Sequence, residues 1–107
     1  MPIQYADKPK QPGESLRYAM TFTPGLSLAS GDSLAGSPTV AIATYPGGVD
    51  KSETMIVAGS VSRSGNQVYV MIQGGTSGLD YKITFKSDTA GGEKSVEEEL
   101  VIEVREY

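Results

Sequence analysis

The sequence contains no cysteine, no histidine and no tryptophan. Without cysteine, no disulfide can strengthen the fold and no thiolate can act as a nucleophile or metal ligand. Without histidine, the chain lacks the commonest general base and the commonest transition-metal ligand. These absences argue against an enzyme, and we predict no catalytic, metal-binding or cofactor-binding residue.

Concentrated positive charge and long apolar runs are also missing. The formal net charge is −4, and the nearest approach to a basic cluster is the loose group Lys8, Lys10 and Arg17. Such a chain would be repelled by a phosphate backbone. Its apolar runs are far shorter than the ~20 residues that span a bilayer, and its first residues do not resemble a signal peptide. We therefore expect no nucleic-acid partner, no membrane partner and synthesis in the cytoplasm.

The chain is instead rich in turn-forming residues and in alternating apolar and polar residues. Its 107 residues suit a single domain, and the 13 glycines and 6 prolines leave no helical period longer than a turn. Apolar residues instead alternate with polar ones, as in half-buried strands. The strands predicted in this way cover residues 16–22, 39–45, 54–62, 67–73, 81–86 and 94–106. The pattern predicts an all-β fold, an immunoglobulin-like antiparallel β-sandwich of about six to eight strands.

The chain divides into two parts. Residues 1–15 are rich in proline and charge and show no periodicity, which predicts an extended N-terminal arm. Residues 16–107 are predicted to form the sandwich domain. The arm is either a frayed terminus or a strap that orders on a neighbouring subunit. Segments 54–62 and 67–73 should pair antiparallel, because the short connection 63–66 joins them.

The acidic residues offer no convergent site. Alternation along a strand places Glu97, Glu99 and Glu103 on one face and turns Glu98 towards the core. We interpret the outer three as a solvated face that discourages sheet aggregation. The glycine loop 74–78 lacks the lysine and the helix of a phosphate loop, so we interpret it as a flexible loop or one shaped for a partner.

Tyr81 opens the clearest amphipathic strand. A tyrosine at the start of a late strand is typical of the tyrosine corner, in which a buried ring bonds to backbone upstream. Exposed tyrosines elsewhere are the best candidates for interface anchors, since aromatic residues dominate binding energies. Together with the proline arm and the glycine loop, the candidate interface residues are Tyr5, Pro9, Pro12, Tyr45, Tyr69, Met71, Gly74, Gly75, Thr76 and Tyr107.

Two segments in the last third resemble the phage fibre–tail adaptor family. They are GGTSGLDYKITF, from Gly74 to Phe85, and TAGGEKSVEEELVIEV, from Thr89 to Val104. Upstream, KQPGESLRYAMTF and LASGDSL are similar to the family's proline-rich start, first strand and Gly-Asp turn. The tryptophan often found after the first strand of such sequences is missing here.

The resemblance implies a structural protein of a tailed-phage virion, made in the host cytoplasm and repeated within a symmetric assembly. Its expected partners are other virion proteins: tail or baseplate proteins on one side and fibre proteins on the other, without cofactor or catalysis. Two alternatives stay open. One is a capsid decoration protein or head-fibre base, and the other is a carbohydrate-binding β-sandwich module.

Overall fold

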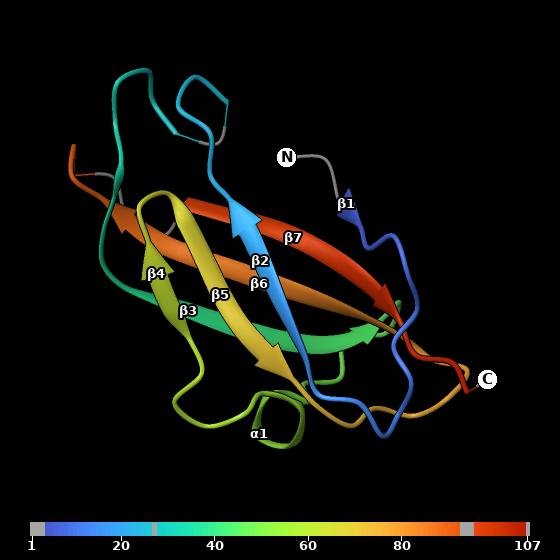
Figure 1. Ribbon diagram of the computed structural model, residues 1–107. Coiled ribbons are helices and arrows are strands. Elements are labelled where there is room, and N and C mark those ends of the chain that lie inside the picture. Colours follow the sequence, from blue (N-terminus) through green and yellow to red (C-terminus); the bar gives the residue numbers. More distant parts are fainter. Residues whose placement is uncertain (1–3, 27, 93–95, 107) are drawn as a thin grey trace.

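The chain folds into two β-sheets packed face to face (Figure 1). The computed structural model describes residues 4–26, 28–92 and 96–106. One sheet has four strands in the order β1 (Gln4–Tyr5), β7 (Val96–Glu103), β6 (Asp80–Thr89) and β3 (Leu34–Tyr45). The other has three, in the order β2 (Leu16–Thr21), β5 (Gln67–Ile72) and β4 (Ser62–Ser64). A short helix, α1 (Ser52–Met55), lies in the connection from β3 to β4.

The predicted all-β sandwich is confirmed. All neighbouring strands are antiparallel except β1, which runs parallel to β7. The sheet of the second, fifth and fourth strands faces the sheet of the first, seventh, sixth and third, and the immunoglobulin-like assignment stays a prediction. The sheets therefore bring together strands that are distant in the sequence.

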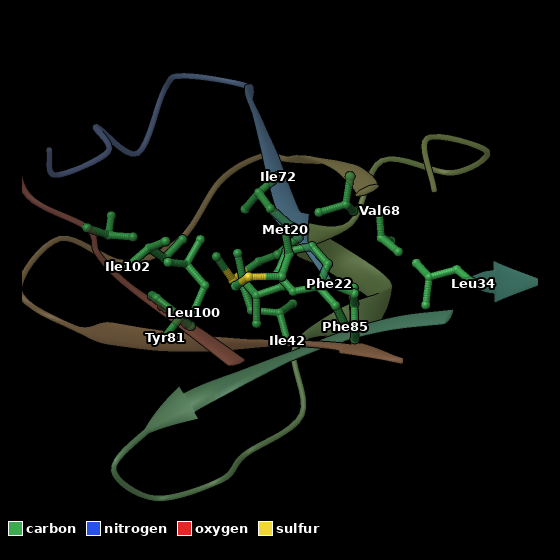
Figure 2. Packing of buried hydrophobic residues seen from close by; sticks show 14 of the residues in the cluster. Met20, Phe22, Leu34, Ile42, Val68, Ile72, Tyr81, Phe85, Leu100 and Ile102 are labelled. Atoms are coloured by element: carbon green, nitrogen blue, oxygen red, sulfur yellow. The ribbon is translucent and has the colours of Figure 1, made fainter. Parts of the chain in front are cut away.

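The core lies between the sheets and follows from the alternation of apolar residues. Val68, Val70 and Ile72 of β5 are fully buried, whereas the residues between them are half-buried. Tyr81, Ile83 and Phe85 do the same on β6. All six belong to one cluster with Met20, Phe22, Ile42, Leu100 and Ile102, most of which is labelled in Figure 2. Leu28, from the long connection after β2, and Leu34, the first residue of β3, are buried as well.

The strand predicted at residues 54–62 is wrong except at its end: Thr54 and Met55 belong to α1, and β4 begins only at Ser62. The Oδ1 of Asp50 accepts hydrogen bonds from the backbone N–H of Ser52 (2.9 Å) and from its hydroxyl (2.7 Å). This local bonding competes with strand formation, and the chain enters α1 instead. The predicted pairing with β5 survives only at the isolated bridge between Ile56 and Ile72 and along β4.

The strand predicted at residues 39–45 begins earlier than expected. β3 starts at Leu34, and the register to β6 shifts between Ala35 and Thr39. Gly36 in that interval has a φ of 73°, a conformation that suits glycine. The glycine, serine and proline that predicted a loop therefore form an irregularity inside a strand.

Candidate protein-binding surfaces

Lys10 fastens the N-terminal segment to the glycine loop. Its side chain is fully buried, and its Nζ donates hydrogen bonds to the backbone oxygens of Gly74 (2.6 Å) and Gln11 (2.8 Å). Its backbone bonds to Glu103 and Arg105, which extends the parallel pairing beyond β7. Burial lowers the pKa of Lys10, and the nearby Glu14 carboxylate opposes that effect. The sequence suggested only a loose basic group here, so this anchoring role was missed.

The described part of the predicted arm lies against its own sheet. The N–H of Ala6 bonds to the oxygen of Val101 (2.9 Å), next to the β1–β7 pairing. Pro9 and Pro12, both predicted interface residues, flank Lys10 and are half-buried. The arm is extended, as expected, and runs along the edge of β7 (Figure 1). Its separation from the sandwich as a distinct part stays a prediction.

The glycine loop is packed rather than open. Gly75 has a φ of +98°, and a Cβ placed on it would lie 2.9 Å from Cγ2 of Val104 and 3.1 Å from Cε of Met55. The N–H of Thr76 donates to the hydroxyl of Tyr81 (2.9 Å), whose ring is buried, as expected of a tyrosine corner. Gly74, Gly75 and Thr76 therefore form a shaped loop held by the core and by Lys10.

Two predicted residues meet on the outer face of the four-stranded sheet. The side chains of Tyr5, on edge strand β1, and Tyr45, at the end of β3, interact electrostatically across this face. The pKa of Tyr5 is raised, chiefly by its electrostatic interaction with Tyr45, with a smaller contribution from burial. The Nζ of Lys82 lies 5.6 Å from the centre of the Tyr45 ring. We call Tyr5, Tyr45, Lys82 and Val101 the tyrosine face.

Strand register explains why the tyrosine face forms. Tyr5 pairs with Val101, and Val101 pairs with Lys82, so the three side chains stand side by side on the same face. Val101 is buried although it points away from the core cluster. Tyr5, in contrast, remains 64% exposed. The result is an apolar patch in which the aromatic ring of Tyr5 is accessible to a partner.

Ion pairs occupy a neighbouring part of this outer face. Cross-strand bridges join Lys82 to Glu99 (3.1 Å) and Lys86 to Glu97 (3.7 Å), and Arg105 bonds to Asp80 (2.8 Å). The predicted solvated face of glutamates is thus a ladder of opposite charges. Glu98 points inward and is buried, as its position in the alternation predicted.

Tyr69 and Met71 lie on the outer face of the other sheet. Both are half-buried. The guanidinium of Arg17 sits over the Tyr69 ring, 4.4 Å from its centre, and the Tyr69 hydroxyl donates to Oε1 of Gln67. The expected apolar face is therefore partly covered by a cation and a carboxamide. Tyr107 lies outside the described residues.

The structure gathers the predicted residues in three places. Pro9, Pro12, Gly74, Gly75 and Thr76 surround the Lys10 anchor, Tyr5 and Tyr45 form the tyrosine face, and Tyr69 and Met71 occupy the opposite sheet. Their role in an interface stays a prediction. Across the described ranges, no group of three acidic residues could hold a metal ion. No helix in this part of the chain is long and apolar enough to cross a membrane.

Comparison with known proteins identifies the family. Residues 10–103 match the family described as podophage GP4 fiber-tail adaptor protein gp77. No curated protein and no solved structure matched the chain. The match runs from the Lys10 anchor to the end of β7 and includes both sheets except β1. The chain belongs to the podophage fiber-tail adaptor family.

Proposed function

We propose that this protein is a non-enzymatic structural component of a tailed-phage virion that joins tail or baseplate proteins to fibre proteins. The observation that carries the proposal is the family match over residues 10–103. Members of such an assembly act by binding neighbours, and the predicted partners are tail and fibre proteins. The protein would be repeated by the symmetry of the particle, and its synthesis would take place in the host cytoplasm.

The geometry supports a rigid adaptor with two separate surfaces. The outer faces of the two sheets point in opposite directions, with the tyrosine face on one and Tyr69 on the other. Tyrosine and arginine are the residues most often responsible for binding energy at interfaces. An adaptor needs two binding faces held at a fixed angle, and a two-layer sandwich with a shared core provides that.

Two other functions remain as alternatives. A capsid decoration protein or head-fibre base would use the same kind of surfaces at another place on the particle. A carbohydrate-binding module is favoured by one observation, the exposed ring of Tyr5 beside Tyr45. Glycan-array binding by the wild-type protein, lost on Tyr5→Ala, would support the carbohydrate alternative.

An electron-microscopy map of the virion tests the proposed location. We expect density for the sandwich between tail and fibre, and density on the capsid would contradict the tail role. The companion experiment measures binding of the purified chain to the tail and fibre proteins of its phage. Tyr5→Ala combined with Tyr45→Ala should weaken binding to one of them by about tenfold or more. The control Ser30→Ala changes an exposed residue outside the tyrosine face and should leave both affinities unchanged.

A further inference from the structure

One edge of the three-stranded sheet carries unused hydrogen-bonding groups. The N–H of Phe22 bonds to the oxygen of Asn66 (2.7 Å). In the antiparallel register of β2 and β5, Phe22 and every second residue before it therefore direct their backbone groups towards β5. Backbone groups alternate sides along a strand, so the N–H and C=O groups of Arg17, Ala19 and Thr21 point away from β5. They have no hydrogen-bond partner among the described residues. Figure 1 shows no strand beside this edge of β2 in its own sheet.

The other sheet edges are shorter or covered. β1 has 2 residues and β4 has 3. The free side of β3 is covered at residues 42–44 by the following connection, through bonds from Thr44 to Val49 and from Lys51 to Ile42, and its earlier part contains Gly36 and Pro38. β2 has 6 residues, and its sequence contains no proline or glycine. An open edge of this length is a template for another strand, and proteins normally protect it.

The charged side chain on this edge, that of Arg17, does not cover the free backbone groups of β2. A lysine or arginine on an edge strand usually deters pairing. Here the Arg17 guanidinium is held over the ring of Tyr69, on the outer face of the sheet. Ala19 and Thr21 have short side chains. The backbone of β2 is therefore accessible along its free side.

A groove runs beside the same edge, between the two sheets. It has a volume of about 470 Å³ and is lined by residues 5–8 of the N-terminal segment, by residues 16–18 and by Leu100. The hydroxyl of Tyr18, at this groove, is buried and has no hydrogen-bond partner in the described part of the chain. Burial raises the pKa of Tyr18, which keeps the phenol neutral and able to donate. A buried donor without an acceptor costs free energy until a partner provides one.

We propose that the free edge of β2 and this groove receive an extended segment of another virion protein, which adds to the sheet as a strand. The segment would be no longer than β2. Its backbone would pair with Arg17, Ala19 and Thr21. Its alternate side chains would be apolar where they enter the groove, and one acceptor would reach the Tyr18 hydroxyl. The identity of the partner as a tail or fibre protein rests on the proposed adaptor function.

A second copy of this chain fits the edge less well than a free segment. Pairing through β2 of another copy would bring in Met20 and Phe22, which already fill that copy's own core. Those side chains could not also occupy the groove. A segment from a different protein brings side chains that are free to enter it.

Backbone amide exchange, followed by NMR, tests the proposal directly. In the isolated protein, the amides of Arg17, Ala19 and Thr21 should exchange fast, and those of Tyr18 and Met20 slowly. The probes are overlapping synthetic peptides that cover the tail and fibre proteins of the same phage. One peptide should bind and protect the three fast amides, and the whole protein that contains it should do the same.

Two variants at one position separate the backbone from the side chain. Ala19→Pro removes an N–H that the fold does not use, and edge strands tolerate proline in this orientation. It should weaken binding by about tenfold or more, because the partner carbonyl loses its donor. Ala19→Thr keeps the N–H and should bind within about threefold of wild type. Equal binding by both variants would overturn the proposal.

The Tyr18 hydroxyl gives an independent readout. Tyr18→Phe should leave the isolated protein as stable as wild type or more stable, because it removes an unpaired buried donor. It should still weaken peptide binding by several-fold. An unchanged affinity would contradict the role of the hydroxyl in the groove.

The outcomes distinguish this inference from the proposed function. If tail or fibre proteins bound while the three amides still exchanged fast, strand addition would be wrong. The proposed adaptor function would not be affected. If those amides became more protected in the isolated protein as its concentration rose, a second copy would occupy the edge. If neither tail nor fibre protein bound the wild-type chain, both proposals would fail.

Discussion

At the residue scale, single polar side chains hold the loops of this sandwich in place. Lys10 connects the N-terminal segment to the glycine loop. At the other end of the molecule, Asp32 accepts hydrogen bonds from the backbone of Ser33 (2.8 Å) and Gly91 (2.9 Å), which ties the connection after β2 to the turn between β6 and β7. Both residues lie in irregular segments, so their loss should affect stability through specific hydrogen bonds rather than through the core.

Lys10→Met should lower the free energy of unfolding by about 1–3 kcal/mol, because two carbonyl oxygens lose their donor in a buried place. Methionine keeps a long apolar chain, so packing is largely retained. Urea denaturation measures the change. Lys8→Met, at an exposed position two residues earlier, is the control and should leave the midpoint unchanged. An unchanged midpoint for Lys10→Met would mean that the anchor contributes nothing.

Asp32 should make stability sensitive to acid. Its pKa is lowered from 3.8, first by the side chain of Thr89 and then by the backbone N–H groups. A carboxyl with a lowered folded-state pKa contributes stability above its unfolded pKa, and this contribution is lost as the pH falls through the folded value. Wild type should therefore lose more stability below about pH 4 than Asp32→Asn does. Asp7→Asn is the matched control; if it flattened the acid response equally, Asp32 would not be the cause.

At the element scale, the segments at the edge of the sandwich differ from the strands that form its core. β1 and the segment up to Lys10 follow β7, and the glycine loop packs against Val104 from the same end. These pieces lie at the boundary of the core rather than inside it. Their contributions can therefore be removed one at a time without dismantling either sheet.

Deletion of residues 1–14 should leave a folded sandwich with reduced stability and weaker assembly. The deletion removes the short β1 pairing and both hydrogen bonds of Lys10 but leaves the two-sheet core. We expect a β-sheet circular-dichroism spectrum and a melting temperature lower by at least about 5 °C. Complete loss of folding would instead show that the arm is an integral strand of the domain.

Gly75→Ala should destabilise the protein by about 1–3 kcal/mol, because the new Cβ would overlap Val104 at a positive φ. Gly78→Ala is a close control, since Gly78 also has a positive φ, of +94°, but nothing within 4 Å of the added Cβ. Chemical denaturation of both variants separates strain from overlap. If both lost the same stability, packing of the glycine loop would contribute nothing.

At the scale of the whole molecule, both sheets share one core. The buried cluster includes residues from β2, β3, β5, β6 and β7, so neither sheet keeps its buried face without the other. We therefore expect a single calorimetric transition for residues 1–107, with an unfolding enthalpy of about 75 kcal/mol near 60 °C. Two resolved transitions would contradict a shared core.

The alternation of apolar residues was enough to predict most of the fold. Strand β2, strand β5, the start of β6 and the course of β7 follow a period of two, because burial of one face imposes that period on any sandwich strand. The errors lie at residues 34–38 and 52–61. There, Asp50 and Gly36 decide the backbone through local hydrogen bonds and a positive φ, which periodicity does not register.

The sequence by itself determined the class of protein: an all-β chain without cysteine or histidine whose last third resembles fibre–tail adaptors. Those features depend on residue type and local order alone. Only the tertiary structure decided which residues meet. Register across β1, β7 and β6 places Tyr5, Val101 and Lys82 side by side. Long-range pairing also buries Lys10 and leaves one side of β2 open, because sheet order depends on contacts between distant segments.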